Sequence, residues 1–261
     1  HSFNLMMKHQ EKLLNRLDEI GQSLARTGKA LALIGLGSVG RELDRLDDYS
    51  DLDFFVIVEP EQKSRFLTNL DWLSGLAPIA YHFQNTVDGY KLLFADGVFC
   101  EFAVFEEAEL ATIPFAPGRI VWKRNGVSEA IAVPVKPSNP SIHSVEWLVG
   151  EALTNLYVGM GRYRRGEKLS AFQFVQVYAL GRVVDLAGHI ETAQPGHADI
   201  FVNERRFEQR FPGIAQHLPE FMPGYEGTPA AANAILHFLD QHFPINPAIK
   251  EAILSLTGSH L

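Results

Sequence analysis

The sequence predicts a mixed α/β (α+β) domain with a small mixed sheet, followed by an all-helical bundle. Between residues 30 and 122 the apolar runs are short and separated by turn signals, which is typical of strands. After residue 140 the periodic apolar segments have helical spacing. Residues 134–140 hold three prolines and mark a boundary, so we predict domains over residues 6–136 and 141–261. Residues 1–5 are expected to be the remnant of an expression tag.

The composition restricts the partners of the chain. Its 261 residues carry a net charge of −8, which disfavours a nucleic-acid partner and is compatible with a small acceptor, a cationic one included. The single cysteine, Cys100, excludes a disulfide framework and a cysteine-rich zinc site. The sequence has neither a membrane-length apolar stretch nor a signal-peptide pattern, so we expect a cytoplasmic protein without a membrane partner.

The first domain combines helical and strand-like segments. The expected elements are a helix over residues 8–26 ending near Gly28, strands over 31–34 and 54–58, a helix capped by Ser64 that stops before Pro78, a three-stranded antiparallel meander over 79–105, and a short strand over 120–122. The meander is predicted because Asp88-Gly89 and Asp96-Gly97 separate apolar runs. Between the first two strands we expect a short helical stretch with Val39 and Leu43 on one side.

The second domain is predicted to contain five helices, over residues 142–165, 170–186, 203–211, 229–242 and 247–257. Four cations gather near the end of the first of them: Arg162, Arg164, Arg165 and Lys168. Their position complements the helix dipole, and one or two could also reach a triphosphate. The aromatic residues Trp147, Tyr157 and Phe172 are expected in the core.

The glycine-rich turn at residues 35–40 has two interpretations. Gly35-x-Gly37-x-x-Gly40 after a strand fits the dinucleotide-binding fingerprint of an NAD(P)-dependent oxidoreductase, with Glu59 as the ribose ligand. Only about two helical turns separate this turn from the next strand, which is short for a crossover between parallel strands. Hairpins, rather than further alternating strands and helices, then follow the second strand.

Two carboxylates stand where that second strand begins. Asp51 and Asp53 alternate with Leu52, so both are expected to project from one face, about 7 Å apart. Because an unpaired buried carboxylate is costly, a hard cation would explain the pair. Glu101 is an acidic residue within a later apolar strand, and it can join the aspartates only if its face of the sheet also carries them.

Gly37-Ser38, twelve intervening residues, and Asp51-x-Asp53 together resemble the signature of the polymerase-β-like nucleotidyltransferase superfamily. Glu101 stands where that family places a third carboxylate, although many members have Asp there. The order Gly40-Arg41 also departs from the family, in which an arginine and a glycine follow the Gly-Ser in that order. Residues 157–171 and 203–208 look more loosely like antibiotic nucleotidyltransferases of the lincosamide and aminoglycoside type.

The resemblance implies two Mg²⁺ ions held by Asp51, Asp53 and Glu101, with Glu101 as metal ligand, general base or both. It implies that Gly37, Ser38 and Arg41 hold the donor, ATP or another nucleoside triphosphate. The reaction would move AMP to a hydroxyl of a small molecule, such as an antibiotic, and release pyrophosphate. A homodimer is compatible with the sequence. The alternatives that stay open are the oxidoreductase and a regulatory module that binds nucleotide without turnover.

Overall fold

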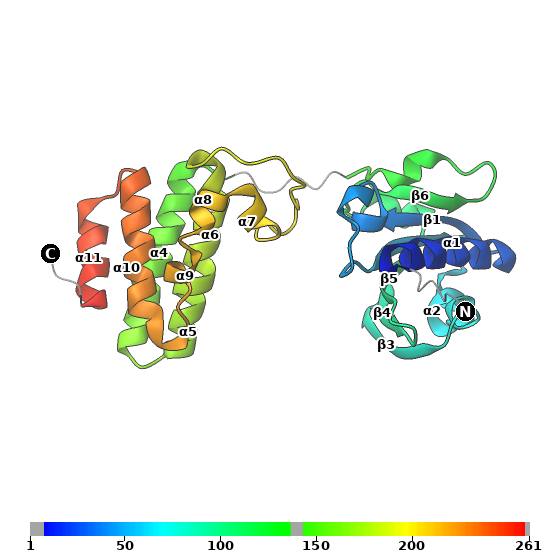
Figure 1. Cartoon of the computed structure of the whole chain (residues 1–261), viewed down its shortest axis with the longest axis horizontal. Helices are drawn as coiled ribbons and strands as arrows, with labels where there is room; N and C mark the ends of the chain where they lie inside the picture. Colours follow the sequence, from blue (N-terminus) through cyan, green and yellow to red (C-terminus); the bar gives the residue numbers. More distant parts are fainter. Residues whose placement is uncertain (1–7, 137–142, 259–261) are drawn as a thin grey trace, which may run out of the picture. The chain divides into compact units, whose positions relative to one another are not determined.

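A computed structural model of the protein describes residues 8–136 and 143–258. The chain divides into two compact units, His1–Ser138 and Asn139–Leu261, of which the first contains a sheet and the second is helical in its described part (Figure 1). Residues 137–140 of the predicted boundary lie outside the described residues, as do residues 1–5. Among the described residues, no helix combines the length and the apolar character needed to cross a bilayer.

The first unit is built on one six-stranded mixed sheet with the order β3-β4-β5-β2-β1-β6. Its strands are β1 Ala30–Leu36, β2 Leu52–Val58, β3 Ile79–Thr86, β4 Gly89–Phe94, β5 Phe99–Glu106 and β6 Arg119–Lys123. Strands β3, β4 and β5 form the predicted antiparallel meander, and both Asp-Gly turns lie between its strands. Strands β2 and β5 pair in parallel, whereas the other neighbouring strands are antiparallel.

The two faces of the sheet are covered differently. On one face α1 (His9–Thr27), α2 (Lys63–Thr68) and α3 (Asp71–Ser74) pack against the buried residues Leu52, Phe54, Cys100 and Phe102. On the other face Ile34, Leu36, Ile57 and Phe105 form a smaller core with residues of the segment 110–132. The strand alternation predicted from the sequence therefore separates a helix-covered face from a second face.

The two short connections of the first unit differ from the prediction. Residues 63–74 form two helices instead of one, because the Asn69 side chain accepts a hydrogen bond from the Asp71 backbone N–H (3.0 Å) and starts a new helix. Gln62, rather than Ser64, precedes the first of them. Between β1 and β2 the predicted helical stretch consists only of the 3₁₀ turns η1 (Gly37–Val39) and η2 (Leu43–Arg45).

In the second unit the long predicted helices are confirmed. The longer ones are α4 Val145–Arg164, the continuous helix formed by α5 Lys168–Phe172, the π segment Gln173–Ala179 and α6 Leu180–Leu186, then α10 Thr228–His242 and α11 Pro247–Thr257. Between α6 and α10 lie the short helices α7 Phe207–Arg210, α8 Pro212–Ala215 and α9 Leu218–Phe221. Two expected core residues are partly exposed instead: Trp147 is 39% exposed and Tyr157 is 45% exposed.

Candidate functional site

Asp53 and Glu101 lie directly opposite each other on the neighbouring parallel strands β2 and β5. Their strand neighbours Leu52 and Phe54, and Cys100 and Phe102, point into the helix-covered core, so the two carboxylates project from the other face. Strands in a sheet are about 4.8 Å apart. The sequence required Glu101 to share its face with both aspartates, and the strand pairing meets this condition for Asp53.

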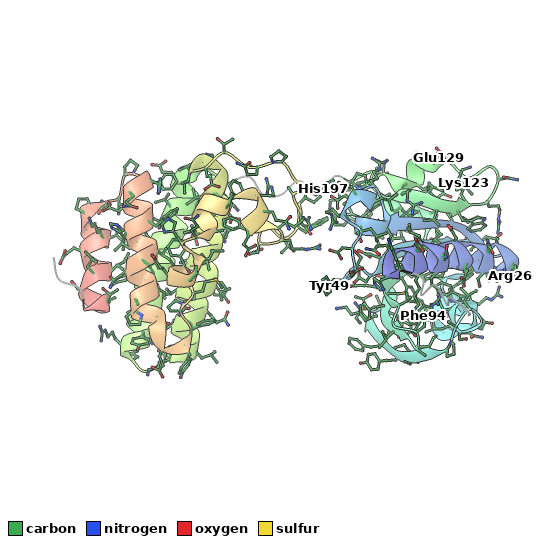
Figure 2. The ribbon with its side chains drawn as sticks, in the orientation of Figure 1. Arg26, Tyr49, Phe94, Lys123, Glu129 and His197 are labelled. Atoms are coloured by element: carbon green, nitrogen blue, oxygen red, sulfur yellow. The ribbon has the colours of Figure 1, made fainter. Side chains whose placement is uncertain are left out.

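Asp51 lies two residues before Asp53 and just outside β2. The loop that leads to it is open to solvent, since Tyr49 is 94% exposed and stands at the surface of the first unit (Figure 2). Burial raises the pKa of the Cys100 thiol, and the charge of Asp51 contributes to the same shift.

Among the described residues, no three His, Cys, Asp or Glu side chains are grouped closely enough to hold a metal ion. What the structure places together is the pair Asp53 and Glu101. The predicted metal trio with Asp51 stays a prediction.

A pocket of about 240 Å³ lies over the acid pair. Its lining residues are Asp53, Phe55, Asn85, Thr86, Asp88, Glu101, Phe102, Ala103 and Phe105. The Asn85 amide group donates a long hydrogen bond to Glu101 Oε1 (3.5 Å). Asn85 comes from β3, two strands beyond β5, and no pattern in the sequence predicts its contact with Glu101.

The glycine turn begins one residue after the position that pairs with Asp53. Leu36 on β1 lies opposite Asp53, and Gly37 follows with φ +56°, a conformation that favours glycine. A Cβ on Gly35 would lie 2.4 Å from the Val39 carbonyl oxygen, and one on Gly40 would lie 2.7 Å from the Gly35 carbonyl oxygen. The contacts of the turn with itself therefore explain two of the three glycines without a dinucleotide.

The dinucleotide-binding interpretation is wrong for this fold. Strands β1 and β2 are antiparallel and joined by 3₁₀ turns, so residues 30–58 do not form the strand–helix–strand unit with parallel strands that the fingerprint requires. Glu59, the proposed ribose ligand, is paired with Arg124 (2.6 Å), and this hydrogen bond lowers the pKa of the Glu59 carboxyl.

Two arginines hold the glycine turn against the start of β6. Arg41 donates through Nε to the Gly118 carbonyl (3.0 Å), and Arg119 donates through Nη2 to the Val39 carbonyl (2.9 Å). Arg41 thus has a structural contact beside its predicted role in donor binding. A third arginine, Arg45, was not predicted. Its Nη2 would lie 3.9 Å from a Cβ built on Gly37, and it forms an ion pair with Glu42.

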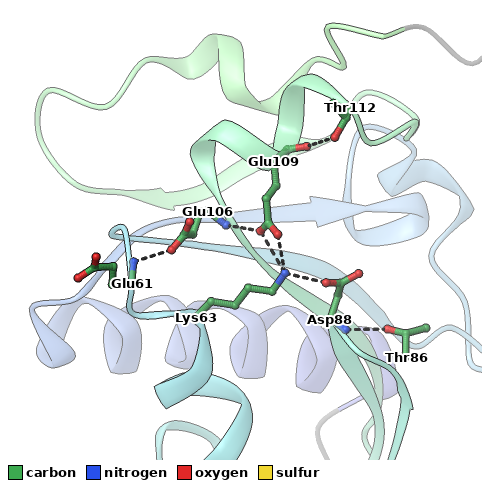
Figure 3. Close-up of polar contacts among 7 residues, drawn as sticks. All are labelled: Glu61, Lys63, Thr86, Asp88, Glu106, Glu109 and Thr112. Atoms are coloured by element: carbon green, nitrogen blue, oxygen red, sulfur yellow. Dashed lines mark hydrogen bonds and ion pairs between the residues drawn. The ribbon is translucent and has the colours of Figure 1, made fainter.

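A network of charges fixes the rim of the pocket (Figure 3). Lys63 Nζ donates to Asp88 Oδ1 (2.6 Å) and to Glu109 Oε1 (2.7 Å). Burial by itself lowers the pKa of Lys63, but the hydrogen bonds with these two carboxylates raise it overall. Glu109 also accepts a hydrogen bond from the Glu106 backbone N–H (2.8 Å). The rim residue Asp88 is therefore held in an ion pair with Lys63.

The cation cluster of the second unit is bound within that unit. Arg162 donates to Ser170 (2.7 Å), Arg164 donates to the Leu256 carbonyl (2.6 Å), Arg165 pairs with Glu167 (2.9 Å), and Lys168 pairs with Glu226 (3.0 Å). These contacts account for all four cations. A separate pocket of about 420 Å³ in this unit is lined by Glu151, Asn155, Val177, Tyr178, Gly181, Arg182, Asp185 and Glu204.

No protein-family model matches the chain, and a comparison with curated proteins gives no match. Among solved structures it is similar to an aminoglycoside 6-adenyltransferase from Bacillus subtilis, with 12% identity and a TM-score of 0.35 over 98% of this chain and 94% of that chain. It is also similar to the Thermotoga maritima CCA-adding enzyme complexed with tRNA, with 12% identity and a TM-score of 0.38 over 95% of this chain and 70% of that chain. Likenesses at this level carry no argument, so the case for a function rests on the residues of the site.

Proposed function

We propose that the protein is a nucleotidyltransferase that moves AMP from ATP to a hydroxyl of a small molecule and releases pyrophosphate. One observation carries the proposal: Asp53 and Glu101 are paired on the parallel strands β2 and β5, and Leu36, which pairs with Asp53 on its other side, is followed directly by the Gly37-Ser38 turn. The two carboxylates and the Gly-Ser turn are the parts that the motif resemblance assigns to phosphoryl chemistry. Their pairing register brings the parts together.

A cation bound between the two acids would relieve their mutual repulsion. Two like charges 4 Å apart cost about 4 kcal/mol at an effective dielectric constant near 20. Asp51, Asp53 and Glu101 would present only carboxylate oxygens, which are the ligands that Mg²⁺ prefers. When bound there, magnesium would neutralise phosphate charge and lower the pKa of the acceptor hydroxyl. The ligand chemistry of these residues therefore suits the metal that the resemblance implies, and Asp53 and Glu101 are the two that the strand pairing places opposite each other.

The residues of the chain bind the substrates and move one proton. Backbone amides around Gly37 and Ser38 would hold the β- and γ-phosphates, as amides of tight turns do for anions. Glu101 would accept the proton of the acceptor hydroxyl as its oxygen bonds to the α-phosphorus. The bond between the α-phosphorus and the bridging oxygen breaks, and pyrophosphate leaves. Glu101 is the base in this scheme because it belongs to the strand farther from the glycine turn.

The test is magnesium-dependent release of pyrophosphate from ATP across a panel of hydroxylated acceptors. Antibiotics of the aminoglycoside and lincosamide type come first in the panel because residues 157–171 and 203–208 resemble enzymes that act on them. Asp53→Asn and Glu101→Gln should each lower turnover by at least about 10²-fold, the scale of one lost electrostatic contact at a reacting centre. Glu129→Gln removes an exposed carboxylate elsewhere in the first unit and should leave turnover unchanged.

Two outcomes would contradict the proposal. Near-normal turnover in Asp53→Asn would show that the acid pair is not part of the catalytic site. Binding of ATP with no pyrophosphate release for any acceptor would instead indicate the regulatory module.

A further inference from the structure

Within the described residues of the first unit, the sheet face that carries Asp53 and Glu101 is covered over only about half of its strands. Over β1 and β2, Leu110, Phe115 and Ile131 close a core against it. Over the hairpin of β3 and β4, two aromatic side chains stay open to solvent: Tyr81 is 59% exposed and Phe83 is 50% exposed. Exposed aromatic rings on one face of an otherwise polar surface mark a binding surface more often than isolated apolar residues do.

The pairing register places these rings on the face of the acids. Reading across the sheet from β1 to β3, the paired residues are Leu36, Asp53, Glu101, Lys91 and Phe83. Paired residues on neighbouring strands point to the same face. Tyr81 pairs with Leu93, which alternates with Lys91 and so belongs to that face too. Phe83 lies two strands beyond Glu101, at about 10 Å, because each strand adds about 4.8 Å.

The order of these five paired residues, here called the row, indicates from which side the acceptor approaches the donor. The glycine turn, which would hold the leaving pyrophosphate, continues from Leu36 at one end of the row. In phosphoryl transfer the attacking and leaving oxygens lie roughly in line on opposite sides of the phosphorus. The acceptor must then approach from the β5 side, across the open half of the face. Lys91 and Phe83 are the residues it meets there.

We propose that Phe83 and Tyr81 form the acceptor-binding surface, and that the acceptor is a hydroxylated compound with a flat apolar ring face. The ring stacks on Phe83 while the hydroxyl reaches Glu101, so the acceptor spans about 10 Å, or about two rings. An aromatic ring and the apolar face of a sugar share this chemistry. Lys91, between the two points of contact, adds one positive charge. The inference rests on the proposed nucleotidyltransferase activity.

The strand offers its own control. His82 is exposed on the same strand, but it pairs with Leu92, a residue of the helix-covered core, and so lies on the opposite face. Phe83→Ala and Tyr81→Ala remove rings from the acid face, whereas His82→Ala removes a ring of the same edge strand from the other face. An effect that comes only from strand propensity would appear in all three variants.

The experiment uses the full chain with magnesium and α,β-methylene-ATP, a donor analogue that cannot transfer AMP. Titration calorimetry measures the binding of phenyl β-glucoside, which carries an aromatic ring, and of kanamycin, which carries only sugar-like rings. We expect at least one probe to bind the wild type. Phe83→Ala should lower the affinity for that probe about tenfold, and Tyr81→Ala should lower it by a smaller factor. The donor analogue should bind all variants equally, and His82→Ala should match the wild type within about twofold.

Several results would overturn the inference while leaving the proposed function in place. In the first, the wild type binds the donor analogue but neither probe. In the second, Phe83→Ala binds the probe as tightly as the wild type does. In the third, His82→Ala loses as much probe affinity as Phe83→Ala. Weaker binding of the donor analogue in Phe83→Ala would make the rings a nucleobase site instead. A wild type that does not bind the donor analogue would contradict the proposed function itself.

Discussion

Gly37 has a backbone conformation that costs other residues free energy, and the chain offers a matched position. Gly37 has φ +56° and Gly28, at the end of α1, has φ +66°. A Cβ on Gly37 would approach only Arg45 Nη2, at 3.9 Å, and one on Gly28 would have open space within 4 Å. Alanine at either position should therefore cost about 1 kcal/mol of folding stability through backbone strain alone.

Only one of these two variants should affect the nucleotide. Gly37→Ala places a methyl group beside the amides proposed to hold the phosphates, so we expect its dissociation constant for magnesium-ATP to rise at least about tenfold, or about 1.4 kcal/mol. Gly28→Ala should lose similar thermal stability and bind ATP normally. Titration calorimetry and thermal unfolding measure the two effects. Equal ATP affinity in both variants would move the phosphate site away from Gly37.

The residues of the site were predictable from sequence to different degrees. Glu101 could be chosen because an acid in an apolar strand is unusual, and its face followed from the two-residue period. Its pairing with Asp53 could not be predicted, because no local signal sets which strands become neighbours. Asn85 lies where the β3–β4 register shifts between Phe83 and Thr86, so alternation does not give its direction. Arg45 depends on the path of a loop without regular periodicity.

At the scale of elements, α1 is tied to the β4–β5 turn by a buried arginine. Arg16 is 7% exposed, its Nη2 donates to Asp96 Oδ2 (2.5 Å), and its guanidinium lies 4.4 Å from the Phe94 ring centroid. Burial raises the pKa of Asp96, but the hydrogen bond and charge of Arg16 outweigh it, so the pKa is lowered overall. The ion pair therefore favours the charged carboxylate in the folded state.

Asp96→Asn should lower the free energy of unfolding near pH 7 by about 1–2 kcal/mol, because Arg16 loses a charged partner that is itself one-third exposed. A lowered folded pKa stabilises the protein above the unfolded pKa near 4, and this contribution disappears as the pH falls through the folded pKa. The difference between the variant and the wild type should therefore begin to shrink near pH 4 and disappear below the folded pKa of Asp96. Urea unfolding from pH 2 to 7 measures this, with the exposed Asp18→Asn on the same helix as control. A constant difference across that range would contradict the assignment.

Strands and long helices were predictable because their periodicity runs over many residues, as in α4 with its buried Leu148, Ala152 and Leu156. The shorter features depend on single side chains. Asn69 divides the segment 63–74 into two helices. In the π segment, the buried Gln176 donates to the Gly224 carbonyl (2.7 Å) and accepts from the Gly224 N–H (3.0 Å). These contacts join positions distant in sequence and give no periodic pattern.

At the scale of the whole molecule, each hydrophobic cluster of the described residues consists of residues of one unit. Two clusters lie in the first unit and one in the second. Leu17 belongs to the former and Leu239 to the latter, and both are buried. We expect two calorimetric transitions, with Leu17→Ala lowering one and Leu239→Ala the other, each by about 2–5 kcal/mol of local stability. A single transition that both variants shift equally would show that the units unfold together. The predicted homodimer and cytoplasmic location stay predictions.

The parallel pairing of β2 with β5 also determines when the acid pair can form. Asp53 and Glu101 are about 50 residues apart in the chain, and α2, α3 and the β3–β4 hairpin are made between them. Parallel strands cannot pair through a tight turn, and long loops delay their contact. At a synthesis rate of about 5–20 residues per second, Asp53 is made roughly 2–10 s before Glu101. During that interval the nascent chain already carries its glycine turn and both aspartates, yet it lacks the acid that pairs with Asp53.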